Sequence, residues 1–105
     1  MKRLRPFVLD AHMHCWDQLS GMIGNQTPVT PLQQGRIRIG DDVVQGMPAT
    51  FLDCRATAER VIADWDANGV AGGILVQEYL DGEQNDYSLQ ILAKYPGRFR
   101  AYALP

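Results

Sequence analysis

The feature that most constrains this chain is the stretch at residues 10–17, which contains both of its histidines. His12 and His14 stand two residues apart, and in an extended strand the side chains at positions i and i+2 project from the same face. Two imidazoles on one face can converge on a single ion. The spacing therefore predicts a strand that carries a metal site.

Alternating side chains extend this pattern over a first strand at residues 5–16. One set is apolar and the other can bind protons or metal: Phe7, Leu9, Ala11, Met13 and Cys15 against Asp10, His12 and His14. In a closed parallel barrel the apolar set would face the outer helices, and the polar set would face the interior near the C-terminal mouth, where such barrels carry out their chemistry. A half-polar strand at a solvated sheet edge would alternate similarly. Cys15 could be a third ligand, although its parity directs it to the opposite face.

Residues 18–53 are predicted to be a loop insertion, because glycine and proline recur too often for a long helix. Within it, residues 36–39 and 43–45 flank a short glycine-containing turn, which predicts a β-hairpin. The insertion leaves the first strand at its C-terminal end and should lie over the active-site mouth, as lids and binding loops do. A surface hairpin without function is the alternative. Arg36 and Arg38 could meet a substrate carboxylate or could simply be solvated.

Two helices and two strands are predicted after the insertion. Apolar residues at helical spacing indicate a helix between residues 55 and 68, capped by Thr57 or Asp53 and stopped by Gly69. Trp65 belongs to its core-facing stripe. Residues 72–76 form a continuous apolar run typical of a strand covered on both faces of a parallel sheet. A second helix to residue 95, capped by Asn85 or Asp86, and a strand at residues 99–104 complete an α/β pattern of right-handed parallel βαβαβ type.

Three further side chains lie where the strands should open into the mouth. Trp16 follows the first strand, and Gln77 and Glu78 follow the second. Each is a candidate substrate contact, and parity does not decide which of Gln77 and Glu78 points inward. Glu78 could also add a ligand to the metal, since it lies near the mouth. Trp16 packing beneath the next loop is the alternative for the indole.

These elements together resemble the amidohydrolase superfamily, in particular the branch that includes lactonases and metal-dependent aromatic-acid decarboxylases. The likeness rests on Asp10-x-His12-x-His14-x-Trp16-Asp17 and, in order, on residues 66–70, 74–77, 94–99 and 101–104. It implies that residues 1–105 are the N-terminal part of a (β/α)8 TIM barrel, about two and a half βα units of it. It also implies that His12 and His14 bind a divalent metal, zinc or manganese, with Asp10 orienting a histidine or joining the metal shell.

The resemblance implies a hydrolase that attacks a small carboxylated, lactone or amide substrate with metal-activated water. A decarboxylase of an aromatic acid is the first alternative, and a non-catalytic α/β interaction or metal-binding module is the second. Later barrel strands would supply further histidines and a catalytic aspartate, so the fragment is not expected to be active alone. A Rossmann-type domain is disfavoured, because no Gly-x-Gly-x-x-Gly loop follows the first strand.

Composition excludes several other classes of function. A net charge of -2 and a pI near 5.5 give no basic patch for nucleic acid or membrane, which leaves a small-molecule substrate. The basic start at residues 1–5 lacks the apolar segment of a signal peptide, and two cysteines are too few for a disulfide framework, so a cytoplasmic location is expected. The unpaired edge of the last strand could allow homo-oligomers to form.

Overall fold

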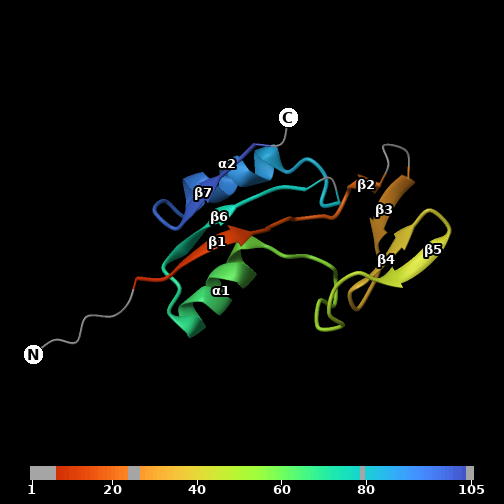
Figure 1. Cartoon of the computed structure of the whole chain (residues 1–105), viewed down its shortest axis with the longest axis horizontal. Coiled ribbons are helices and arrows are strands. Elements are labelled where there is room, and N and C mark those ends of the chain that lie inside the picture. Colours follow the sequence, from red (N-terminus) through yellow and green to blue (C-terminus); the bar gives the residue numbers. More distant parts are fainter. Residues whose placement is uncertain (1–6, 24–26, 79, 104–105) are drawn as a thin grey trace, which may run out of the picture.

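The computed structural model describes residues 7–23, 27–78 and 80–103. The strand of the histidine motif and the two later predicted strands form a parallel sheet (Figure 1). The sheet has the order β1-β6-β7, where the strands are β1 (Leu9–Met13), β6 (Gly72–Leu75) and β7 (Phe99–Ala101). Helix α1 (Ala58–Asn68) precedes β6, and helix α2 (Asn85–Lys94) joins β6 to β7. The chain is thus a small α/β domain, and the predicted order of strands and helices is confirmed.

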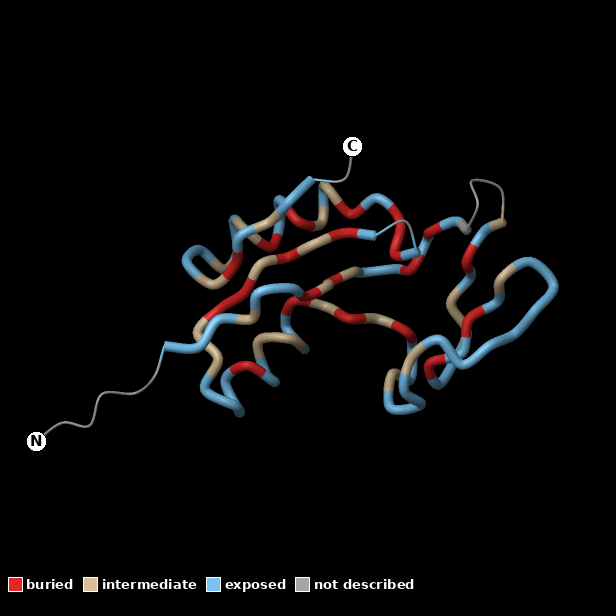
Figure 2. Tube along the Cα trace, viewed as in Figure 1, coloured by how far each residue is buried: buried red, intermediate tan, exposed pale blue. Residues whose placement is uncertain are grey.

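Both helices cover the same face of this sheet. One buried cluster contains side chains from every element of the layer, namely Met13, Cys15, Ala58, Trp65, Leu75, Ile91 and Phe99. Trp65 is only 5% exposed, and its ring centroid lies 4.9 Å from that of Phe99, so its prediction as a core residue is confirmed. Figure 2 shows the buried residues along β6 and on the inward sides of both helices.

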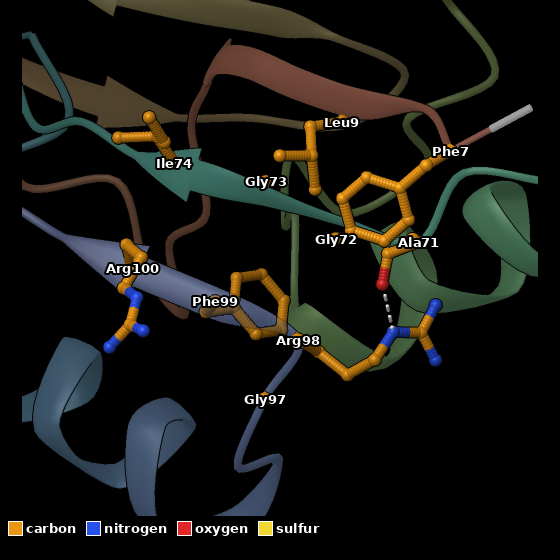
Figure 3. Close-up of a pocket in the computed structure, with 10 residues that line it drawn as sticks. All are labelled: Phe7, Leu9, Ala71, Gly72, Gly73, Ile74, Gly97, Arg98, Phe99 and Arg100. Carbon is orange, nitrogen blue, oxygen red and sulfur yellow. Dashed lines mark hydrogen bonds between the residues drawn. The ribbon is translucent and has the colours of Figure 1, made fainter.

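The opposite face of the sheet is open among the described residues. Leu9 is 54% exposed there, and a pocket of ≈ 500 Å³ lies over Leu9, Ile74 and Arg100 (Figure 3). The expectation that β6 is covered on both faces is therefore wrong for the described part of the chain. In the described part of the chain, α1 and α2, which connect β1 to β6 and β6 to β7, lie on the same side of the sheet.

A β-bulge divides β1 and changes which residues share a face. Asp10 pairs with Gly73 and Met13 pairs with Leu75, so β1 has one more residue than β6 between these positions. Asp10 therefore lies on the helix-covered face, where a Cβ at Gly73 would meet both Trp65 and Asp10. The predicted strict alternation is wrong before the bulge, where Leu9 is on the open face. It is right after the bulge, where Met13 and Cys15 are buried against the helices.

The ends of the helices follow local chemistry with one exception. Thr57 caps α1 by accepting a hydrogen bond from the Arg60 N–H, and Gly69 ends it with φ 71°, as predicted. The predicted caps of α2 are wrong, because Gln84 holds the cap position without a side-chain cap bond. The Glu83 carboxylate instead accepts from the N–H of Asn85 at 2.7 Å.

The predicted strand ends extend further than the observed strands. β1 begins at Leu9 and ends at Met13 rather than spanning residues 5–16, while β6 and β7 end at Leu75 and Ala101. The start of the first predicted strand, residues 5–6, and the last residue of the third predicted strand, Leu104, lie outside the described residues. In the described ranges, no helix combines the length and the apolar character needed to cross a lipid bilayer.

The insertion forms an antiparallel sheet beyond the C-terminal end of β1 (Figure 1). Its strands, in the order β2-β3-β4-β5, are β2 (Met22–Ile23), β3 (Thr27–Pro31), β4 (Arg36–Ile39) and β5 (Asp42–Gln45). The predicted hairpin of β4 and β5 is confirmed, with Ile37 paired to Val44. β2 and β3 were not predicted, because the prolines in β3 argue against a strand. A small cluster of Leu19, Val29 and Ile37 forms the core of the insertion.

Candidate metal centre

The two histidines lie together at the carboxyl end of β1. Their ring centroids are 5.0 Å apart and the ring planes are inclined by 77°. Met13 and Cys15, which alternate with them, are buried with the helices, so both imidazoles project from the open face of the sheet. His12 is exposed and His14 is partly buried. The expectation that both rings share one face is met.

The orientation of His14 leaves one ring nitrogen available to a metal. Its Nδ1 lies 2.8 Å from the carbonyl oxygen of Val76. A carbonyl oxygen only accepts hydrogen bonds, so in neutral His14 the proton is on Nδ1 and the lone pair is on Nε2. A backbone carbonyl that binds the other ring N–H is the usual way in which proteins orient a ligating histidine.

Glu78 completes a group of three potential ligands. One ligand atom from each of His12, His14 and Glu78 lies within 4.8 Å of the others, and His14 Nε2 is 3.4 Å from Glu78 Oε1. Two ligands of a tetrahedral zinc ion with bonds of about 2.0–2.1 Å are about 3.3 Å apart. His14 and Glu78 already have this separation, and the group could hold a metal ion if the ligand atoms that lie up to 4.8 Å apart moved closer. Two histidines with one glutamate are a known catalytic zinc set.

Asp10 lies apart from this group. Its Oδ1 accepts a hydrogen bond from the backbone N–H of His12 at 3.2 Å, and the bulge places the residue on the face that carries Trp65. In this geometry Asp10 stabilises the backbone at the bulge rather than either imidazole ring. Its assignment to the metal shell stays a prediction that the geometry does not favour.

The three predicted substrate contacts differ in what their side chains bind among the described residues, and only the Glu78 carboxylate approaches a histidine. Gln77 is buried: its Oε1 accepts from the Gln84 N–H at 2.6 Å, and its Nε2 donates to the Tyr102 carbonyl at 3.1 Å. Trp16 donates from Nε1 to the Cys54 carbonyl at 2.6 Å and packs on the core of the insertion. Gln77 and Trp16 therefore connect elements, which is the alternative considered for the indole.

Asp81 is the site residue that the sequence analysis missed. Its Oδ2 is 3.7 Å from His14 Nδ1, and its side chain is 7% exposed. Burial raises the pKa of Asp81, the nearby His14 lowers it, and the Glu78 carboxylate raises it further. In the sequence, Asp81-Gly82-Glu83-Gln84 is typical of a turn. The available signal was an acidic residue in the loop at the carboxyl edge of a predicted parallel strand, which is where ligands of α/β sheets gather.

Cys15 is excluded from this group by its position. The thiol is 1% exposed and lies among the core residues under the helices. Burial raises the pKa of Cys15 to about 12, and the Glu59 carboxylate adds to the shift. A thiol binds metal as the thiolate, so burial and charge both oppose a ligand role.

Comparisons with models of protein families, with curated proteins and with solved structures found no match to this chain. The site is therefore interpreted from its own geometry. Two imidazoles and one carboxylate provide three ligand atoms and one negative charge for a divalent cation. They leave a fourth tetrahedral position open, and such a position distinguishes catalytic zinc sites from structural ones.

Proposed function

We propose that this chain is the N-terminal portion of a metal-dependent hydrolase with a TIM-barrel fold, which acts on a small carboxylated, lactone or amide substrate. The observation that supports the proposal most is the group of His12, His14 and Glu78 with ligand atoms within 4.8 Å. Zinc is the first choice of metal and manganese the second, because imidazole suits zinc and carboxylate suits both.

The open face of the parallel sheet supports the barrel part of the proposal. In a closed barrel the helices lie outside, and the other face of each strand fills the interior with side chains. Here α1 and α2 cover one face, while Leu9 and Ile74 line the uncovered pocket on the other (Figure 3). The histidines project from that same uncovered face at the carboxyl ends of the strands, where barrel enzymes have their active sites.

The residues of the site have separate parts in such a reaction. A zinc ion bound there supplies a Lewis acid and lowers the pKa of a coordinated water to about 7. The Val76 carbonyl holds the His14 ring with Nε2 toward Glu78, so that both would bind the ion and the Glu78 carboxylate would offset part of its charge. A base that accepts the proton of water is expected from a later strand, so the fragment should bind metal without efficient turnover.

A second candidate is a non-catalytic metal-binding module. It is favoured by one specific observation, which is that this chain supplies all three ligand atoms, from the end of β1 and from the segments that follow β1 and β6. Metal binding would then need no later strand. This candidate shares the metal centre with the hydrolase and differs in having no catalytic base.

Metal titration tests the site common to both candidates. Zinc and manganese affinities are measured by competition with a chromophoric chelator, for the unsubstituted chain and a His12→Ala/His14→Ala double variant. Because loss of a single outer-shell partner lowers metal affinity by about 10–100-fold, loss of both imidazoles should lower zinc affinity by at least about 100-fold. Removing two exposed carboxylates of the β4–β5 turn, Asp41→Asn/Asp42→Asn, is the control and should change little. Unchanged affinity in the histidine variant would reject the ligand assignment.

A further inference from the structure

A network of buried amides joins the carboxyl ends of the three parallel strands. Gln77, which follows β6, accepts a hydrogen bond from the Gln84 N–H at 2.6 Å and donates to the Tyr102 carbonyl, just after β7, at 3.1 Å. The side chain of Gln84 donates to the carbonyl of Gln18, beyond β1, at 3.0 Å. Gln77 and Gln84 are only 9% and 7% exposed. The network lies at the edge of the sheet that carries the metal centre.

Gln84 is connected to Glu78 along two routes. On the first, Gln84 Nε2 donates to the Asp81 carbonyl at 3.1 Å, and the Asp81 N–H donates to the Glu78 carbonyl at 3.1 Å. On the second, the backbone N–H of Gln84 binds Gln77, the residue that precedes Glu78. Gln84, the N-cap residue of α2, is thus hydrogen-bonded both to the residue before Glu78 and to the turn that follows Glu78.

The turn that contains Asp81 and Gly82 packs against Ser20, near the start of the insertion. The N–H of Ser20 donates to the Asp81 carbonyl at 3.0 Å. Gly82 has φ 88°, and a Cβ at this position would collide with Ser20 Oγ. Only glycine fits such a left-handed backbone at so close an approach. The turn therefore has a fixed position relative to β1, which carries the two histidines.

We propose that Gln84 is a positioning residue of the metal centre, which fixes the turn after β6 against the segment after β1 so that the Glu78 carboxylate faces His14. This inference rests on the metal site of the proposed function. Glu78 itself is exposed, and its side chain is 51% accessible. Without the buried Gln84 amide, the last ligand would sit on a solvated turn, and the separation of 3.4 Å from His14 Nε2 would not be maintained before metal binds.

The test is a thermodynamic cycle on zinc affinity. Gln84→Met removes both donors of the side chain and keeps its length and apolar stem, and it should lower zinc affinity by about 10–100-fold. Glu78→Gln should have a similar effect. Because Gln84 acts through Glu78, the double variant should bind zinc about as weakly as Glu78→Gln alone, whereas independent effects would add. Gln90→Met makes the same substitution on the exposed side of α2 and serves as the matched control.

Cobalt provides a readout that a loss of stability would not reproduce. The visible absorption bands of Co²⁺ bound to Gln84→Met should resemble those of Glu78→Gln and differ from those of the unsubstituted chain, since in both variants the Glu78 carboxylate is no longer held in the ligand position. Circular dichroism without metal shows whether each variant is folded. Gly82→Ala, which displaces the same turn sterically, repeats the experiment if Gln84→Met does not fold.

The outcomes separate the two claims. Full zinc affinity and an unchanged cobalt spectrum in Gln84→Met, together with weakened binding in Glu78→Gln, would overturn the positioning role and leave the metal centre standing. Additive losses in the double variant would also overturn it. No zinc binding by the unsubstituted chain would overturn the metal centre, and the positioning role with it.

Discussion

The two sheets of this molecule bury apolar side chains to very different extents. Among the residues whose burial the structure describes, the parallel sheet and its helices enclose seven in one cluster, whereas the antiparallel insertion encloses three. Every residue of β5 is exposed, and Val43 and Val44 are 48% and 41% accessible. Since apolar burial is the main stabilising term in folding, the α/β layer should determine the stability of the molecule and the insertion should depend on its attachment.

That attachment consists mainly of polar contacts, both at the turn after β6, where Gln18 and Ser20 are hydrogen-bonded, and at the two chain segments that lead into and out of the insertion. The Trp16 N–H donates to the Ala56 carbonyl at 2.9 Å, and its indole donates to the Cys54 carbonyl. Arg55 pairs with Asp17, which joins the two chain segments that lead into and out of the insertion. The insertion is therefore held by contacts at its base rather than by a large core. We expect it to open locally while the α/β layer stays folded.

The largest expected effect comes from the core of the α/β layer. Trp65→Ala removes a 5% exposed indole and should lower the free energy of unfolding by about 3–5 kcal/mol. Ile37→Ala, at 3% exposure in the insertion, should lower it by about 2 kcal/mol at most, because local opening relieves the cavity. Urea unfolding followed by far-UV circular dichroism measures both. Equal losses would show that the two regions unfold as one unit.

An intermediate effect is expected in the rates at which the two cysteine thiols react. Cys15 lies in the α/β core and Cys54 at the base of the insertion, and both are buried and free. A thiol-specific reagent reaches either one only when its region opens, so Cys54 should react about 100-fold faster than Cys15, which corresponds to about 2.7 kcal/mol in opening free energy. Single-cysteine variants, Cys15→Ala and Cys54→Ala, separate the two rates. Similar rates would contradict independent opening of the insertion.

The raised pKa of Cys15 makes the stability of the α/β layer depend on pH. Burial raises the pKa from 9.0 to about 12, so between these values the folded chain keeps a proton that the unfolded chain has lost. Stability must therefore fall as the pH rises above 9. Cys15→Ala should reduce this fall, and denaturant unfolding at pH 8 and pH 10 measures it.

The smallest effect is expected at the ion pair between the end of the insertion and α1. Arg60 lowers the pKa of Asp53 to about 2 through side-chain hydrogen bonds of 2.7 and 2.9 Å. The folded pKa is depressed, so the stabilisation is present above the ordinary value of 3.8 and is lost as the pH falls toward 2. Asp53→Asn should lower the free energy of unfolding slightly at pH 7 and by a smaller amount at pH 3, as measured by denaturant unfolding at the two pH values. Both groups are exposed, so high salt should reduce the difference.

Much of the α/β layer could be predicted from the sequence, because its signals are local. Thr57 and Gly69 mark the ends of α1 by side-chain capping and by left-handed backbone, and Trp65 falls on the apolar stripe. The insertion was predicted less completely. Its hairpin follows from alternation around a glycine turn, but the pairing of β3 with β4 depends on contacts between distant residues and on a strand that contains two prolines.

The site was predicted in part for the same reason. The spacing of His12 and His14 is a local signal, and it indicated a shared face correctly. For Glu78 the sequence indicates only a position near the mouth, as a substrate contact or a further ligand, and for Asp81 it indicates only a turn. Their approach to His14 depends on the close packing of the turn against Ser20. Asp10 was grouped with the histidines because alternation in the sequence does not reveal a bulge.

The bulge in β1 has a consequence for how the chain could be altered. In a regular ladder continuing from the pair of Asp10 with Gly73, His12 would stand opposite Leu75 and turn toward the buried cluster. Regularising the strand without removing a residue would exchange the inward and outward sides of everything downstream, directing the imidazoles toward the apolar interior and the Cys15 sulfur toward solvent. Deleting one residue of the bulge would instead keep Met13 opposite Leu75 and leave both sides as they are. The bulge thus decides whether this edge of the sheet presents imidazoles or a thiol.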